Sequence, residues 1–268
     1  MNTMMAIQVH PVTGQLVPRS MARPVPLIDE VLVRVRAAAL EVGEHGQGPH
    51  RPTRLAAERS LDRSLEFAGT VAAFGGGDGE GRFVVGQEVF GLVDPARGCA
   101  LAEYAVVSSV SLAGRPRTIS FAEAAALPAA SVVAWDAVTG HEESRPGQPV
   151  IVPDGSGEPG LYAVQIAAAR GLRVAAIGAG ARRALLYELG ADPVILPDAH
   201  VPSTADLVFD HRTRSTAHRE PTLTAIAGLV DRGCVRPLVD RIFPMGAAAY
   251  AFASASRTRG PGRTILVT

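Results

Sequence analysis

Cysteine is nearly absent from this sequence. Only Cys99 and Cys234 occur among its 268 residues, and they lie far apart along the chain. Two isolated cysteines provide neither a disulfide framework nor a Cys-x-x-Cys metal site. The sequence therefore predicts two reduced thiols in a cytoplasmic protein.

An excess of charge of one sign is also lacking. The 26 basic residues balance 26 acidic ones, so the net charge is zero and gives no electrostatic reason to expect nucleic acid or an anionic membrane as partner. The first residues lack a charged segment followed by an apolar core, so no signal peptide is expected, and no apolar run is long enough to cross a bilayer. With 47% hydrophobic residues, a folded globular protein is expected rather than a disordered one.

The first part of the chain is rich in β-strand patterns. Residues 30–40 alternate valine with arginine, which is typical of a half-buried strand. Further strands are predicted at 65–77 and 100–107, and 82–93 is predicted to hold two short strands around a turn. Short strands at regular spacing predict a small barrel-like or sandwich domain.

The pattern changes near residue 120. Ser120 and Glu123 have the spacing of a helix capping box, and an alanine-rich helix follows, interrupted by Pro128. Strand patterns at 150–153, 173–178, 193–197 and 206–210 then alternate with helical patterns. Such alternation predicts βαβ units with a parallel sheet. A helix at 222–233, a strand with a second helix, and a final strand at 263–268 complete the chain.

A glycine-rich turn lies between the strand at 150–153 and the next helix. Gly155, Gly157 and Gly160 match the dinucleotide fingerprint G-x-G-x-x-G, with Ser156 inside the turn. The glycines permit a close approach of backbone to phosphate, and the helix offers N–H groups and a positive dipole end. These four residues are therefore candidate cofactor-binding residues.

Two residues of the turn oppose this interpretation. Glu158 places a carboxylate beside the expected diphosphate, and Pro159 removes one N–H group. Proline is also favourable at the start of a helix, so the turn can equally be a plain helix start. The sequence leaves open whether the turn still binds a nucleotide.

The acidic residue that reads the ribose 2′-hydroxyl of NAD is missing from the region where it is expected. Arg182 and Arg183 stand there instead. Guanidinium groups favour a 2′-phosphate, and hence NADP(H) over NAD(H). The alternative is that both are solvated arginines in the first turn of a helix.

Many weak motifs occur in one order, among them SLEFAGTVAAFG, FVVGQEVFGL, ALAEYAVV, ISFAEAAALPAASVVAW and PVIVPDGSGEPGLYAVQIAAARGLRV. In this order they resemble the medium-chain dehydrogenase/reductase superfamily, and within it the zinc-independent quinone oxidoreductase and enoyl reductase branch. The resemblance implies an α/β protein with a GroES-like β-rich catalytic domain at residues 1–120 and 240–268. It implies a Rossmann-like domain, here truncated, at residues 121–239.

Several positions depart from the pattern of the superfamily. Leu65 stands where zinc-dependent members have a histidine, and the expected cysteines are absent, so no metal site is expected. The zinc-independent relatives usually have Asn and Asp in the segment at residues 40–45, and Thr-Ala where this chain has Val133-Ala134. Both polar sites are changed.

The largest departure is a deletion after Asp210. In the superfamily two further strand-bearing units follow, which need roughly 50–60 residues, but only residues 211–221 occupy this interval. We therefore predict a shortened sheet in which 206–210 is an edge strand. The missing half normally holds the nicotinamide and pairs the subunits of family dimers, so a homodimer stays an open alternative.

The chemistry implied by the resemblance is hydride delivery from NADPH to an enone or quinone, with a proton donor nearby. Candidate donors are Glu41, Glu44, His45, His50 and Tyr104. The histidines and Glu44 are equally explained by a solvated loop, and Tyr104 by packing.

Three functions stay open at this point. The chain reduces an activated double bond with NADPH, or it is a derived enzyme without a nicotinamide cofactor that cyclises or isomerises a polyketide-like metabolite, or it is a non-catalytic binding protein. The cofactor is accordingly NADP(H) or none.

Overall fold

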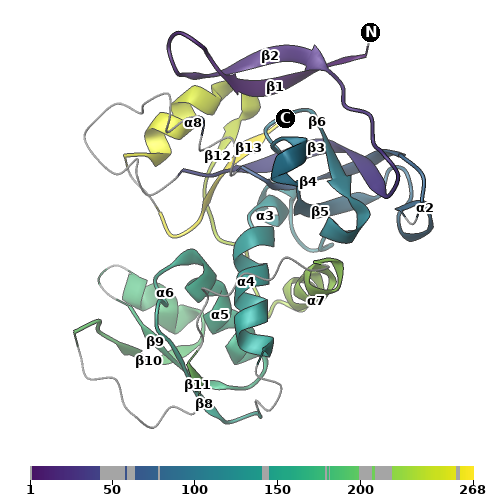
Figure 1. Ribbon diagram of the computed structural model, residues 1–268. Coiled ribbons are helices and arrows are strands. Elements are labelled where there is room, and N and C mark those ends of the chain that lie inside the picture. Colours follow the sequence, from purple (N-terminus) through teal and green to yellow (C-terminus); the bar gives the residue numbers. More distant parts are fainter. Residues whose placement is uncertain are drawn as a thin grey trace. The chain divides into compact units, whose positions relative to one another are not determined.

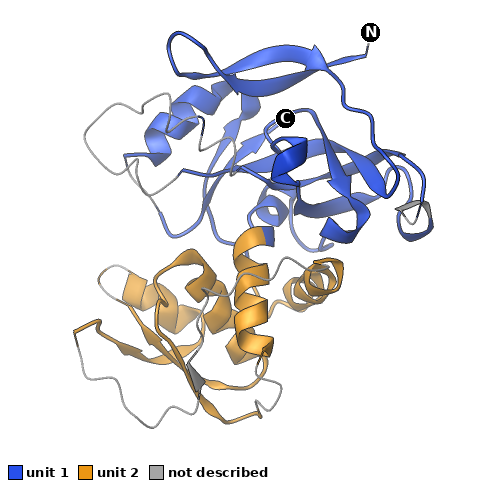
Figure 2. Ribbon diagram, viewed as in Figure 1, with its two compact units in different colours: residues 1–128, 237–268 blue, residues 129–236 orange. Residues whose placement is uncertain are grey.

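The computed structural model describes residues 2–42, 58, 64–77, 79–140, 145–178, 180, 182–198, 207–208, 219–257 and 260–268 (Figure 1). The chain divides into two compact units (Figure 2). Unit 1 comprises residues 1–128 and 237–268, and unit 2 comprises residues 129–236.

Unit 1 is built on β-strands. Seven of them form a sheet in the order β12-β13-β3-β4-β5-β7, with β6 paired to β3. The strands of this sheet are β3 (Glu30–Leu40), β4 (Glu66–Phe74), β5 (Glu88–Leu92), β6 (Tyr104–Ser108), β7 (Leu112–Gly114), β12 (Val239–Pro244) and β13 (Arg263–Val267). Among the residues that the structure describes, the helices of unit 1 are α2 (Gly79–Arg82), α3 (Phe121–Ala125) and α8 (Ala248–Ala255).

Strand β3 forms where its alternating sequence predicts it. Val31, Val33 and Val35 are completely buried, whereas Arg34 and Arg36 are exposed, as period-two alternation requires. Strand β3 pairs antiparallel with β4, β6 and β13. This strand therefore carries the centre of the sheet.

The N-terminal hairpin is an element that the sequence patterns do not indicate. Strands β1 (Thr3–Val9) and β2 (Leu16–Ala22) pair with each other in a separate two-stranded sheet. The expectation of two strands within 82–93 is wrong, because only β5 forms there. Val84 and Val85 are each 65% exposed and precede a turn at Gly86, whose φ is 87°, so they gain no sheet partner.

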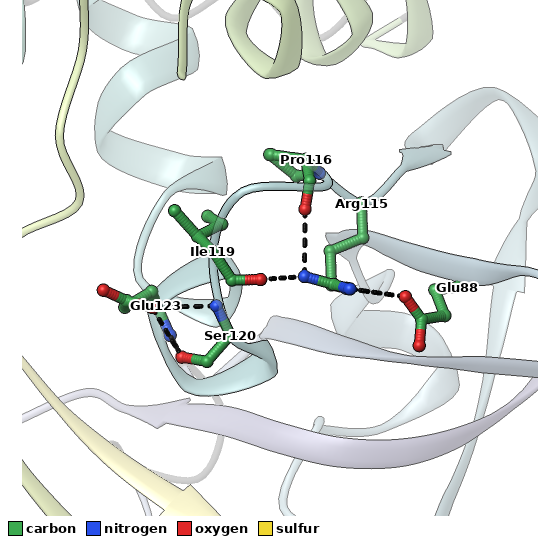
Figure 3. A network of polar contacts seen from close by, with 6 residues as sticks. All are labelled: Glu88, Arg115, Pro116, Ile119, Ser120 and Glu123. Carbon is green, nitrogen blue, oxygen red and sulfur yellow. Dashed lines mark hydrogen bonds and ion pairs between the residues drawn. The ribbon is translucent and has the colours of Figure 1, made fainter. Parts of the chain in front are cut away.

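The turn into α3 has the capping box that its sequence predicts. The Ser120 hydroxyl accepts a hydrogen bond from the Glu123 backbone N–H, and the Glu123 carboxylate accepts one from the Ser120 backbone N–H (Figure 3). Helix α4 (Pro128–Thr139) follows at the proline that interrupts the alanine-rich run. The cap thereby fixes the start of α3.

Arg115 connects this turn to the sheet of unit 1. Its Nη1 donates to the carbonyl oxygens of Pro116 and Ile119, and its Nε donates to the Glu88 carboxylate at 3.1 Å (Figure 3). Because Glu88 begins β5, the guanidinium holds the end of the connection against the sheet.

Unit 2 contains a parallel sheet with helices. The strands follow the order β10-β9-β8-β11. They are β8 (Pro149–Val152), β9 (Arg173–Ile177), β10 (Ala191–Ile195) and β11 (Leu207–Val208). With α4, the helices of this unit are α5 (Glu158–Ala169), α6 (Arg182–Glu188) and α7 (Glu220–Asp231).

This strand order is that of the first four strands of a Rossmann sheet, whose full order is 3-2-1-4-5-6. Strand β11 occupies the fourth place and is the last strand of this sheet among the residues that the structure describes. The shortened sheet therefore agrees with the prediction made from the deletion. Within the same residues, no helix is both long and apolar enough to cross a membrane.

Candidate functional site

The glycine turn follows the carboxyl end of β8, where the order of the sheet reverses. From β8 the chain adds β9 and β10 on one side and returns to place β11 on the other. In open α/β sheets ligands bind outside the carboxyl ends of the strands at such a reversal. The turn thus lies where a nucleotide site is expected.

Gly155 and Gly160 are required by close approaches of the backbone. A Cβ atom on Gly160 would lie 1.8 Å from the carbonyl oxygen of Asp154, and one on Gly155 would lie 2.9 Å from the Cβ of Ala176. The Gly155 N–H donates to the carbonyl of Ile177 in β9 at 3.0 Å. Both glycines therefore hold α5 tightly against the end of the sheet, as in a dinucleotide-binding turn.

Gly157 has a different environment, which the sequence reasoning missed. Its N–H donates to the Asp154 carboxylate at 3.0 Å. An Asp three residues before a glycine in a turn is a usual signal for such a side-chain contact. The carboxylate thus takes an N–H group of the kind that would otherwise face a phosphate.

Helix α5 begins at Glu158, with Gly157 as its N-cap and Pro159 in its first turn. Glu158 and Asp154 therefore bring two carboxylates to the turn, and Pro159 contributes no N–H group. The Oγ of Ser156 is buried and has no hydrogen-bond partner among the described residues. It lies close to Gly178 at the end of β9, where an added Cβ would be 2.7 Å away.

Both arginines suggested for a 2′-phosphate are in the first turn of α6. The Nη1 of Arg182 donates to the backbone carbonyl of Ser156, which links α6 to the glycine turn. Arg183 points its guanidinium over the ring of Tyr187 at 5.8 Å and donates to the Tyr187 hydroxyl at 3.5 Å. The structure therefore places Arg182 at the glycine turn. Arg183, the next residue in the chain, is exposed on α6 and contacts Tyr187.

Tyr187 is a partner of Arg183 that the sequence reasoning did not consider. The hydrogen bond from Arg183 lowers the pKa of its hydroxyl below the usual 10.0, and the backbone N–H of Val194 adds to this effect. The signal in the sequence is the i, i+4 spacing of Arg183 and Tyr187 on one helix face.

The glycine turn combines close backbone packing with charges of both signs. Arg182 reaches the turn through the Ser156 carbonyl, and Arg183 follows it in α6. The two carboxylates and Pro159 reduce the attraction of the turn for the diphosphate. The turn is therefore an intact Rossmann turn with weakened anion-binding chemistry.

Among the acid and base candidates, Glu41 belongs to a buried ion cluster. Its carboxylate accepts from Nη1 of Arg263 in β13, and Nη2 of Arg263 lies 2.6 Å from the carboxylate of Glu66. The backbone N–H of Glu41 donates to the Ser64 hydroxyl at 3.0 Å. Glu41 is therefore held in place from two sides.

Tyr104 begins β6, and the guanidinium of Arg23 lies 3.7 Å above its ring. Tyr104 pairs with Arg34 in β3, whereas Glu41 follows the far end of that strand. The rise of an extended strand places the two about 20 Å apart. The structure does not bring these two candidates together, and Glu44, His45 and His50 lie outside the described residues.

Metal-binding residues do not gather in the parts of the chain that the structure describes, where three or more His, Cys, Asp or Glu side chains nowhere form a group suited to a metal ion. Leu65, which occupies the position of the histidine of zinc-dependent members, packs against the hydrophobic core of unit 1.

Several known proteins similar to this chain are named as oxidoreductases. It is 33% identical over 193 residues to a quinone-oxidoreductase homolog of chloroplasts from Spinacia oleracea, covering 69% of this chain and 57% of that protein. It is 28% identical over 182 residues to the mitochondrial NAD(P)H oxidoreductase RTN4IP1 of Danio rerio, covering 62% and 47%. The chain thus spans about half the length of these curated relatives. No protein-family model matches it.

Among solved structures, an alcohol dehydrogenase superfamily protein from Novosphingobium aromaticivorans has a TM-score of 0.78 at 23% identity, covering 99% of both chains. This likeness establishes the fold, with its GroES-like and Rossmann-like parts. The relatives in sequence and in structure are consistent with the medium-chain dehydrogenase/reductase superfamily.

Proposed function

We propose that this chain is an oxidoreductase of the zinc-independent quinone oxidoreductase type, which uses NADP(H) and acts on a small quinone or enone. The names of its relatives support oxidoreductase chemistry with a nicotinamide cofactor. We assign the catalytic domain to unit 1 and the nucleotide-binding domain to unit 2. We also propose a cytoplasmic location, with a small-molecule substrate and no nucleic-acid or membrane partner. A homodimer is compatible with this proposal.

The observation that carries the proposal is the glycine turn of unit 2. Gly160 brings α5 so close to Asp154 that no side chain fits between them. That contact is the one a dinucleotide-binding turn needs, and Arg182 reaches the same turn through the Ser156 carbonyl. NADPH, when bound, supplies the hydride, and these residues bind and orient its adenosine end.

Binding is expected to be weak. Only residues 209–219 lie between β11 and α7, where the superfamily has further strands that hold the nicotinamide. Asp154 and Glu158 add negative charge beside the diphosphate position. Arg182 and Arg183 therefore provide most of the affinity, through the 2′-phosphate.

A second candidate function is supported by the same carboxylates. A chain that no longer needs a diphosphate site tolerates Asp154 and Glu158 in the turn. Such a protein would be a derived enzyme of secondary metabolism, a cyclase or isomerase that acts on a polyketide-like substrate by acid and base chemistry alone. In this case Glu41, Glu44, His45 and Tyr104 are the proton-transferring candidates.

Calorimetry with NADPH, NADH and 2′,5′-ADP tests the proposal, together with quinone- or enone-dependent oxidation of NADPH followed by absorbance. We expect NADPH and 2′,5′-ADP to bind with similar, weak affinity, NADH to bind more weakly still, and turnover to be slow. The complete absence of NADPH binding and turnover would favour the non-redox enzyme. Binding of NADPH far tighter than that of 2′,5′-ADP would show that the nicotinamide end is held after all.

Removing one carboxylate from the turn sharpens this test. Asp154→Asn keeps an acceptor for the Gly157 N–H but removes the charge, so NADPH should bind about threefold to tenfold more tightly. Asp198→Asn is the matched control, because Asp198 is exposed in the turn after β10 and its charge is not part of the glycine turn. Equal affinities of the two variants would contradict a repulsive role for Asp154.

A further inference from the structure

We propose that unit 1 carries a binding pocket for small, flat, apolar ring compounds with carbonyl oxygens, separate from the glycine turn. The pocket has a volume of about 310 Å³. Its wall comes from β1, from the end of β2 and from the connection between β5 and β6, and every wall residue belongs to unit 1. Pockets of this size with mostly apolar walls bind small organic ligands.

The chemistry of the wall suits a flat ring. Met4 and Met21 present thioether groups from the two strands of the hairpin, and Tyr104 presents an aromatic ring from β6. Thioethers adapt to irregular apolar shapes and make favourable contacts with aromatic rings. Few polar side chains reach the wall, with Gln8 and Arg97 among them, so most of a ligand's surface would contact apolar atoms.

The pocket is held open by backbone contacts of β1. The Ile7 N–H donates to the Leu101 carbonyl at 2.8 Å, and the Glu103 N–H donates to the Met5 carbonyl at 2.9 Å. The Glu103 carboxylate in turn accepts from the Met5 N–H at 2.7 Å. A wall fixed in this way does not need to be ordered when a ligand binds, which favours affinity.

The guanidinium of Arg23, beside the wall, is the reason to expect a carbonyl oxygen on the ligand. Arg23 lies in sequence between the wall residues Ala22 and Pro24, and its guanidinium covers one face of the Tyr104 ring at 3.7 Å. Its Nε is buried and has no hydrogen-bond acceptor among the described residues. A buried donor without an acceptor is costly, so a ligand oxygen that satisfies it would contribute to binding.

Cys99 makes this pocket accessible to a direct test. It is half-buried in the pocket wall, whereas the chain's other cysteine, Cys234, is exposed in unit 2. The sequence contains no lysine. Thiol-directed reagents therefore have two side-chain targets in the whole chain, one inside the pocket and one outside it.

The experiment compares two maleimides that carry the same reactive ring. N-(1-naphthyl)maleimide is flat and apolar, and N-(2-hydroxyethyl)maleimide is small and polar. In each reaction the cysteine sulfur bonds to one alkene carbon, and the thiol proton ends on the neighbouring carbon. The rates of labelling of Cys99 and Cys234 are measured by peptide mass spectrometry on the intact chain, without nucleotide.

We expect the polar reagent to label the exposed Cys234 faster. The naphthyl reagent should shift the ratio of rates toward Cys99 by at least about tenfold, because burial of the naphthyl group in the pocket concentrates it there. Its rate at Cys99 should also saturate with concentration. The same ratio for both reagents, with linear rates at both cysteines, would overturn the proposal.

A competitor and a pair of variants test whether the preference of the naphthyl reagent for Cys99 arises in the pocket. N-(1-naphthyl)succinimide has the same shape without the reactive alkene, so it should protect Cys99 and leave Cys234 unprotected. Ala22→Trp should fill the pocket and abolish the naphthyl preference. Ser20→Trp, on the same exposed strand but outside the wall, should keep it.

Protection of neither cysteine by the succinimide would contradict the proposal even if Ala22→Trp failed to fold. The inference stands apart from the proposed redox function, because every measurement omits NADPH. Loss of the naphthyl preference would leave the nucleotide proposal intact, and absence of NADPH binding would leave the pocket intact.

Discussion

In unit 1 the guanidinium of Arg263 lies between the carboxylates of Glu41 and Glu66, with all three side chains largely buried. In unit 2 the glycine turn is held by close backbone packing that leaves no room for a side chain at Gly160, and the ion pair between Arg236 and Glu188 elsewhere in the unit is exposed. The ion cluster and the glycine turn therefore depend on different properties of their residues. The cluster should be sensitive to lost charge, and the turn to added side-chain volume.

The largest expected effect is the loss of the buried cation in unit 1. Arg263→Gln leaves two buried carboxylates without their shared partner, so the free energy of unfolding should fall by about 3 kcal/mol. Denaturant unfolding followed by circular dichroism measures this.

Arg236→Gln in unit 2 is the control for this variant. The side chains of Arg236 and Glu188 are 54% and 63% exposed, so water screens the pair and its loss should cost less than about 1 kcal/mol. Equal costs for the two variants would show that the units do not differ in their dependence on charge.

An added methyl group in the glycine turn should have the next largest effect. Gly160→Ala places a Cβ 1.8 Å from the Asp154 carbonyl oxygen, so α5 must shift and unit 2 should lose about 2–3 kcal/mol. The same substitution at Gly228 in α7 brings a Cβ no closer than 3.3 Å to the flexible Arg232 guanidinium. Gly228→Ala should therefore be neutral or stabilising by about 0.5–1 kcal/mol. Thermal unfolding of both variants measures the difference. Equal stability of Gly160→Ala and Gly228→Ala would contradict the tight packing inferred for Gly160.

The smallest effect concerns the exposed pair on α6. Arg183→Gln removes the main cause of the lowered pKa of Tyr187, so this pKa should rise toward 10.0. A lowered pKa in the folded state stabilises the fold above the pH at which unfolded tyrosine ionises, and this contribution is lost as the pH falls through the folded pKa. Since Tyr187 is 42% exposed, the change in stability should be small and the ionisation itself is the better readout.

Absorbance titration of the tyrosinate signal measures this ionisation. Tyr187→Phe identifies the transition that belongs to Tyr187 among the four tyrosines of the chain. Arg182→Gln is the control, because Arg182 donates to the Ser156 carbonyl. An unchanged Tyr187 transition in Arg183→Gln would mean that the backbone N–H of Val194 is the dominant cause.

Much of the fold could be predicted because its signals are local. The alternation of residues 30–40 gave β3 its bounds, and the Ser120 and Glu123 spacing gave the cap of α3. The glycine pattern with its flanking strand and helix indicated the Rossmann turn. Each of these signals depends on residues within a few positions of one another.

The features that the sequence did not indicate have two origins, a weak local signal in the hairpin and contacts between residues far apart in the chain. The β1–β2 hairpin includes Pro18, which lowers its strand signal and is tolerated because the hairpin forms its own two-stranded sheet. Glu41 looked like a proton donor, yet its partner Arg263 is 222 positions away. The pocket likewise joins β1 to a segment about a hundred residues later.

The position of β13 has a consequence for how the chain folds as it is synthesised. β13 pairs with both β12 and β3, joining Thr264 to Leu40 in the middle of the seven-stranded sheet. All strands of the unit 2 sheet lie between residues 149 and 208, so they leave the ribosome earlier. The second unit in sequence can therefore mature first, while the last residues of β3, from Ala37 to Leu40, lack their partner strand until residues 263–267 emerge. Such late closure of a long-range sheet slows folding and exposes these residues to wrong partners in the nascent chain.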